Sequence, residues 1–91
     1  MKVIKCKKAS KMLGVNYADL LDIVKAVLIT QQEVRRDGLC FRLLGEKRNE
    51  QIVKGEVHVF TTNGIQIVLS DAKRCTDAYG SMALLEGKLV C

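Results

Sequence analysis

The side chains that could carry metal or redox chemistry are four cysteines and one histidine. The cysteines stand at positions 6, 40, 75 and 91, with no CxxC pair, and His58 alone could complete a metal set. A structural zinc site needs four converging ligands, which local pairs normally supply. The spacing therefore predicts no metal and no cofactor. We interpret Cys6, Cys40 and Cys75 as small buried residues and Cys91 as exposed.

Catalysis would have to use His58, the one side chain expected to titrate near neutrality. Acid–base work needs a partner group, and the sequence identifies none, although pairing with Cys40 or Cys75 stays open. The position of His58 between Val57 and Val59, with Phe60 on the same strand face, favours a structural histidine in a strand. The sequence contains no glycine-rich phosphate loop either. We therefore predict that the protein is not an enzyme.

Binding of a polyanion is the other chemistry that the sequence suggests. Five lysines precede Asp19, the first acidic residue, whereas from Met12 onward ten Lys and Arg balance ten Asp and Glu. The net charge of +5 therefore resides in the first eleven residues, at Lys2, Lys5, Lys7, Lys8 and Lys11. Such a segment releases counterions when it binds nucleic acid. A solvated, solubilising terminus is the alternative interpretation.

A single α+β domain, residues 1–91, is expected to position these groups. The length suits one core, and the absence of a membrane-spanning stretch or secretion signal predicts a cytoplasmic protein. We expect a short strand at Val3 and Ile4, a helix over residues 8–13 that ends at Gly14, and a second helix capped by Asn16. Apolar residues at helical spacing give the second helix one buried face: Leu20, Ile23, Val24, Val27 and Leu28.

Two antiparallel β-hairpins are predicted to follow and to form a small sheet. Asp37-Gly38 suits a two-residue type I′ turn, in which both residues have positive φ. The implied register sets Val34 opposite Phe41 and Glu33 opposite Arg42, an apolar pair and an oppositely charged pair. The first hairpin is therefore self-consistent.

The second hairpin is predicted around Asn63-Gly64, with Phe60 opposite Ile67 and Val59 opposite Val68. Its strands are apolar on both faces, which predicts central strands covered on both sides. Residues 45–49 are expected to form the loop between the hairpins, and Gly55 a bulge or the start of a strand.

A C-terminal helix is expected to begin at Ser70-Asp71 and to end at Gly87. Its apolar residues recur at intervals of three and four: Ala72, Cys75, Tyr79 and Met82. The apolar tail, residues 89–91, is expected to pair on a sheet edge.

Residues 9–16, followed by Leu20 and Ile23, resemble the helix-turn-helix pattern of DNA-binding proteins. In that pattern a small residue lets two helices approach, a glycine makes the turn, and an aliphatic residue anchors the second helix. Ser10, Gly14 and Leu20 occupy those places.

With the strand before it and the arginine-tipped hairpin after it, the segment 1–44 is similar to the winged-helix layout of phage excisionases and mercury-regulator-type proteins. Similar helix pairs occur in the N-terminal modules of bacterial translation initiation factors. The resemblance implies that the second helix enters the major groove and that the hairpin tip contacts phosphates. The residues that it nominates for DNA contact are Lys7, Lys8, Lys11, Asn16, Tyr17, Arg35 and Arg36. Asp19 and Asp22 depart from the pattern, because phosphates repel them.

The function predicted from these features is that of a small DNA-binding or accessory regulatory protein. The alternative is a protein-interaction module, such as a viral or mobile-element accessory protein that binds and modulates a host protein. The alternative is motivated by the apolar strands within residues 57–69, which helices, a second copy or a partner must cover. A homodimer is expected, because a chain of this size has little core of its own.

Overall fold

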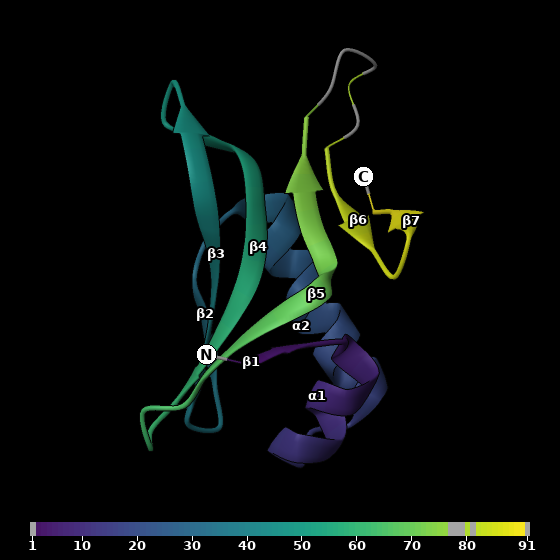
Figure 1. The fold of residues 1–91 in the computed structure, drawn as a ribbon, viewed down its shortest axis with the longest axis vertical. Helices are drawn as coiled ribbons and strands as arrows, with labels where there is room; N and C mark the ends of the chain where they lie inside the picture. Colours follow the sequence, from purple (N-terminus) through teal and green to yellow (C-terminus); the bar gives the residue numbers. More distant parts are fainter. Residues whose placement is uncertain (1, 77–79, 81, 91) are drawn as a thin grey trace.

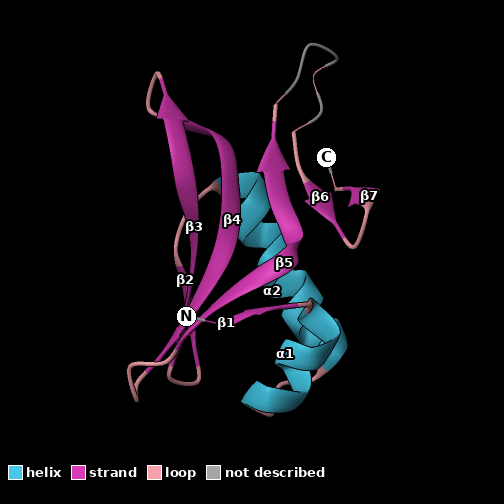
Figure 2. Cartoon of the chain, viewed as in Figure 1, coloured by secondary structure: helices cyan, strands magenta, loops and turns pink. Residues whose placement is uncertain are grey.

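The computed structural model of the protein describes residues 2–76, 80 and 82–90. Two helices pack against a seven-stranded, mostly antiparallel sheet (Figure 1, Figure 2). The neighbouring strands follow the order β2-β3-β4-β5-β6-β7, and β1 pairs in parallel with β5. The elements are β1 (Lys2–Ile4), α1 (Cys6–Leu13), α2 (Tyr17–Thr30), β2 (Val34–Arg36), β3 (Leu39–Arg48), β4 (Gln51–Thr61), β5 (Gln66–Cys75), β6 (Leu84–Leu85) and β7 (Lys88–Leu89).

The helix pair forms where the sequence predicts it. Gly14 ends α1 with φ 68°, a left-handed conformation that glycine adopts without steric cost, and its N–H donates to the carbonyl of Ser10. The Asn16 Oδ1 accepts from the N–H groups of Ala18 and Asp19 at 2.9 and 3.3 Å, as expected for a cap. The predicted strand before the helices is also confirmed, as β1.

The beginning of α1 has a distant cap. Lys5, at the N-cap position, makes no side-chain cap, and the Cys6 N–H donates instead to Asp71 Oδ1 at 3.0 Å. The carbonyl of Asp71 in turn accepts from the Glu86 N–H at 2.7 Å. One residue of β5 therefore fixes the start of the first helix and the C-terminal β6–β7 hairpin together.

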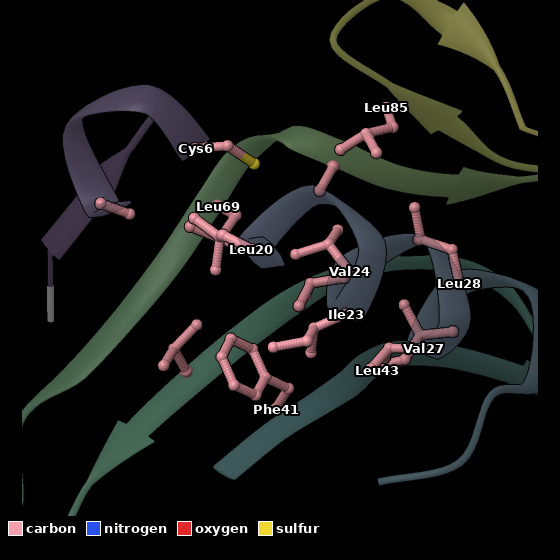
Figure 3. Close-up of a cluster of buried hydrophobic side chains, with 14 of the residues drawn as sticks. Cys6, Leu20, Ile23, Val24, Val27, Leu28, Phe41, Leu43, Leu69 and Leu85 are labelled. Carbon is pink, nitrogen blue, oxygen red and sulfur yellow. The ribbon is translucent and has the colours of Figure 1, made fainter. Parts of the chain in front are cut away.

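The core lies between α2 and the face of the sheet that is turned toward the helices, called here the inner face. All five residues of the predicted apolar face of α2 are buried. Figure 3 shows them opposite Phe41 and Leu43 of β3 and Leu69 of β5. The inner face is completed by Val57, Val59 and Ile67, which are also buried. The helices therefore cover one face of the apolar strands within residues 57–69, for which a second copy or a partner was the alternative cover.

The first predicted hairpin is confirmed. Asp37 and Gly38 both have positive φ, 50° and 79°, as a type I′ turn requires. Val34 lies opposite Phe41, the register derived from the sequence. Glu33 precedes β2, and its carboxylate forms an ion pair with Arg42 as the expected charge pairing requires.

The second hairpin forms, but its predicted register is wrong by one residue. Val59 lies opposite Ile67 and Phe60 opposite Gln66. The turn has three residues rather than two, because the Gly64 N–H donates to Thr61 and the Thr61 N–H donates to Ile65. Gly64 has φ 82°, whereas Asn63 is not among the positive-φ residues, which fits a type I turn closed by a glycine bulge. A shift of one residue exchanges the two faces of β5.

The expected loop at residues 45–49 is also wrong, because β3 continues to Arg48 and pairs with β4 through Gly45↔Gly55. The reversal occurs instead at Asn49 and Glu50, both with positive φ, between the paired residues Arg48 and Gln51. Neither residue is glycine, so the turn carried no strong sequence signal. Gly55 lies within β4 rather than at its start, one residue before a register shift at Glu56/Val57.

The predicted fold class is wrong in its C-terminal part, because residues 70–75 continue β5 and form no helix. The register shift leaves Leu69 opposite Val57 and Lys73 opposite Glu56, so three β5 residues between them have no partner on β4. Beyond this irregularity the burial alternates with a period of two: Ala72 and Arg74 are buried, Lys73 and Cys75 exposed. The small sheet of two hairpins is thus a larger, curled sheet (Figure 1).

The remaining residues of the expected helix form another hairpin where they are described. Leu84 pairs with Leu89 and Leu85 with Lys88, around Glu86 and Gly87, whose φ values are 54° and 79°. Gly87 thus makes a type I′ turn rather than a helix end. Tyr79, which was expected on the helix, lies outside the described residues, as does Cys91; the expected edge pairing of the tail holds for Leu89.

Candidate nucleic-acid interface

The lysine-bearing surface of α1 is the first candidate feature. Cys6, Ala9 and Ser10 face the core, and the residues between them turn outward. The exposed lysines of this helix, called here the α1 lysines, are Lys7, Lys8 and Lys11. Lys2 and Lys5 are exposed as well. Throughout residues 2–76, 80 and 82–90, none of the ion pairs involves a lysine, so the α1 lysines carry uncompensated charge.

The tips of the β2–β3 and β4–β5 hairpins lie at one end of the molecule (Figure 1). The end of α1 and the start of α2 lie at the same end. A cleft of about 280 Å³ lies between the Gly14 turn and the wing tip, defined here as residues 35–38 of the β2–β3 hairpin; it is lined by Asn16, Asp19, Arg36 and Asp37 among others. A second cleft of about 300 Å³ is lined by Lys2, by Met12 and by residues at the tips of the β2–β3 and β4–β5 hairpins. The α1 lysines line neither cleft.

The arginines nominated at the wing tip are held by neighbouring carboxylates. Arg35 Nε lies 2.8 Å from Glu33, which also binds Arg42. Arg36 lies 3.8 Å from Asp19 and 3.7 Å from Asp37. Hydrogen bonds from Cys40, Arg42 and Arg35 lower the pKa of Glu33 to about 2, so this carboxylate stays charged at neutral pH. The wing tip is therefore close to electrically neutral.

The two nominated residues of α2 have structural roles in this fold. The side-chain oxygen of Asn16 is engaged in capping the helix, and Tyr17 is half-buried against the core. The solvent-accessible side chains near the start of α2 include two acids. Asp19 is half-buried and Asp22 is exposed. Of the nominated residues, only the α1 lysines therefore combine exposure with unpaired charge.

The side of the sheet turned away from the helices, called here the open face, carries a cluster that the sequence did not single out. The open face is formed by Val3, Arg35, Cys40, Arg42, Leu44, His58, Phe60, Gln66 and Val68. The rings of His58 and Phe60 stack with centroids 6.4 Å apart, and the Arg42 guanidinium lies 5.6 Å from the Phe60 centroid. The spacing of His58 and Phe60 gave the shared face but not their neighbours. The register error misplaced Gln66, and Arg42 lies beside them through the pairing of β3 with β4, which was not predicted.

His58 is half-buried on the open face, and its Nδ1 lies 3.0 Å from the Gln66 amide nitrogen. Burial lowers the pKa of the imidazole below its usual value, opposed by Glu56. The hydrogen-bond partner of the ring is an amide rather than a carboxylate. The expected position of His58 in a strand is confirmed.

The thiols are free and separate in the described part of the chain. Cys6 is buried as expected, and burial, together with the Asp71 carboxylate, raises the pKa of its thiol. Cys40 is half-buried, and its Sγ lies 3.1 Å from the Glu33 carboxylate. Cys75 is exposed, so its predicted burial is wrong, because the strand alternation turns it outward.

The described residues contain neither a metal-binding cluster nor a helix that could span a membrane. No group of three or more His, Cys, Asp or Glu side chains is placed to hold a metal ion. No described helix is long and apolar enough to cross a bilayer.

Comparisons of the chain with protein-family models, with curated proteins and with solved structures gave no match.

Proposed function

We propose that the protein binds nucleic acid, and that it does so chiefly through the phosphate backbone at the α1 lysines. The observation that carries the proposal is the contrast between these lysines and the arginines: the lysines are exposed and unpaired among the described residues, whereas the wing-tip arginines are neutralised by carboxylates. Phosphate contacts supply affinity without sequence information. The function is therefore that of an accessory DNA-binding protein with little base readout by α2.

The winged-helix resemblance supports this proposal only through the relative positions of α2 and the wing tip. We do not propose that α2 recognises bases. The start of α2 and the wing tip share one cleft, and both lie at the same end of the molecule as the end of α1 (Figure 1). Asp19 and Asp22 would repel phosphates there. We therefore assign the wing tip a secondary part in binding, conditional on release of its arginines.

A salt-dependent shift assay on duplex DNA tests the proposal. We expect Lys7→Ala with Lys8→Ala and Lys11→Ala to weaken binding by at least about tenfold at low salt. The slope of log affinity against log salt should become shallower by about three, one for each lost phosphate contact. The double change Arg35→Ala with Arg36→Ala should have a smaller effect, because these side chains already have carboxylate partners.

The matched control removes the same charge elsewhere, with Lys47→Ala, Lys54→Ala and Lys88→Ala, three exposed lysines on other elements. Equal losses from the two triple variants would mean that net charge, rather than the α1 surface, determines affinity. No binding by the unaltered protein at low salt would overturn the proposal and favour an interaction module.

Glu33 is expected to limit the contribution of the wing tip. Glu33→Gln removes the carboxylate shared by Arg35 and Arg42 and should free both guanidinium groups for phosphates. The expected result is tighter DNA binding with a salt slope steeper by about two. Glu50→Gln is the control, because it removes an equal charge from an exposed residue that takes part in no ion pair of the described residues. A slope unchanged by Glu33→Gln would show that the wing tip lies away from the DNA.

The alternative of a protein-interaction module has one supporting observation. Val3 and Leu44 on the open face are 60% and 40% exposed. The stronger motive for a partner is gone, because α2 covers Val57, Val59, Ile67 and Leu69. The homodimer expected from the small core of a chain of this size stays a prediction.

A further inference from the structure

A groove of about 450 Å³ lies between the tips of the β2–β3 and β4–β5 hairpins, beside Phe60 of the open face. Its lining includes one aromatic residue, two arginines, one aspartate and two threonines: Phe60, Arg35, Arg36, Asp37, Thr61 and Thr62. The volume falls within the range of small-molecule sites, about 300–1,000 Å³. The groove is therefore large enough to hold a planar heterocycle against the ring.

Phe60 is held in place by two neighbours on the open face. His58 stacks on it with an interplanar angle of 19°, and Arg42 lies over the ring. Arg42 is itself fixed by Glu33. None of these three residues lines the groove, so they support the ring and leave its remaining surface to the groove.

The groove adjoins the lysine-bearing end of the molecule. Thr61, Thr62 and Gly38 line it and also line the neighbouring cleft that contains Lys2 and Met12. Met12 is the penultimate residue of α1, next to Lys11. A nucleic-acid strand whose phosphates lie along Lys2 and Lys11 would therefore reach the groove across the hairpin tips. The positive charge of these lysines complements a polyanionic ligand.

We propose that this groove binds an unpaired base of single-stranded nucleic acid, with the base stacked on Phe60 and a neighbouring phosphate beside Arg35. The inference rests on the proposed function and names its substrate more narrowly. The ion pair of Arg35 with Glu33 is exposed, and exposed pairs contribute only about 0–1 kcal/mol, so a phosphate held there by a base stacked on Phe60 can replace the carboxylate. Duplex bases are stacked and paired, and so they do not reach such a groove.

The test compares three fluorescent probes by anisotropy: an oligothymidylate of about twelve nucleotides, an abasic strand of the same length, and a duplex of the same length. Stacking of a base on an aromatic side chain contributes about 1–3 kcal/mol, which corresponds to about fivefold or more in affinity. The unaltered protein should bind oligothymidylate at least about fivefold more tightly than the abasic strand. Phe60→Leu should remove this preference and leave affinity for the abasic strand unchanged.

Two controls accompany the variant. Phe60→Tyr keeps the ring and should keep the preference, and Leu44→Ala changes an exposed residue of the open face that does not line the groove. Should Phe60→Leu fail to fold, amide chemical shifts of the unaltered protein decide the matter. Oligothymidylate, but not the abasic strand, should shift Thr61 and Thr62 relative to other residues.

The outcomes separate the two proposals. Equal affinity for oligothymidylate and the abasic strand overturns the stacking groove and leaves phosphate binding intact. Preference for the duplex that Phe60→Leu does not change has the same meaning. No binding to any probe at low salt overturns the proposed function and the groove together.

Discussion

Gly45→Ala is expected to lower the free energy of unfolding by about 3 kcal/mol, since a side chain forced into a close-packed position typically costs about 1–3 kcal/mol or more. A Cβ on Gly45 would meet the backbone carbonyl oxygen of Lys54 and the Cα of Gly55, neither of which can move without separating β3 from β4. The total stability of a chain of this size is roughly 5–13 kcal/mol. The melting temperature should therefore fall by about 15 °C.

Gly87→Ala provides the comparison for Gly45→Ala. Gly87 has φ 79°, and nothing lies within 4 Å of a Cβ built on it, so only the left-handed backbone opposes the change. That strain costs about 1–2 kcal/mol. Urea unfolding of both variants separates steric from conformational cost. Equal losses would mean that β3 and β4 do not approach as closely as the Gly45↔Gly55 pair requires.

Arg74→Met is expected to destabilise the protein by about 3 kcal/mol, because each buried acceptor left without a donor costs about 1–3 kcal/mol. Arg74 is only 4% exposed; its Nε donates to the carbonyl of Ile52 at 2.7 Å and its Nη1 to that of Leu28 at 3.1 Å. The Leu28 carbonyl lies in the last turn of α2, where helical partners run out. Methionine keeps much of the volume but satisfies neither carbonyl.

The measurement is again urea unfolding, with Arg74→Lys and Arg48→Met alongside. Arg74→Lys keeps the charge near the negative end of the α2 dipole but cannot reproduce two divergent N–H donors, so an intermediate loss is expected. Arg48 is exposed, and its change should stay within about 0.5 kcal/mol. A fully stable Arg74→Met variant would contradict the bridging role assigned to this guanidinium.

The parts of the fold that the sequence predicts correctly depend on local signals. The Gly14 turn, the Asn16 cap and the Asp37-Gly38 hairpin each need only a few neighbouring residues, and each forms as expected. Asn63-Gly64 also marks a turn, but a two-residue and a three-residue turn share this dipeptide. Hydrogen bonding of the completed strands decides between them, and the choice sets the register of every later pair.

The C-terminal part could not be predicted because tertiary contacts override local preference. Ala72, Cys75 and Met82 fit helical spacing, yet the wide irregularity opposite Glu56 and Val57 resets the strand alternation and turns Arg74 inward. A lone arginine in an apolar pattern indicates exposure, unless carbonyl groups from two distant elements surround it. Those carbonyls belong to residues 28 and 52 and are invisible in the local sequence.

The candidate interface was predictable in part. Exposure of the α1 lysines follows from helical spacing and from the absence of acidic neighbours in the sequence. Pairing of Arg36 with Asp19 depends on how the hairpin sits against α2, which spacing does not reveal. The groove beside Phe60 lies between residues 35–40 and residues 60–62, so it depends on the pairing of β3 with β4, for which the sequence offered no register.

The attachment of the N-terminal segment to β5 has a consequence for the order of folding. Residues 2–4 pair with residues 67–69, and the Cys6 N–H is capped by Asp71, 65 positions along the chain. Contacts of such large sequence separation close late and slow the search for the native state. During synthesis, the lysine-rich segment must therefore wait until residues 67–71 have emerged before it acquires a fixed orientation. A nascent chain would carry the same charges without yet displaying them as a shaped surface.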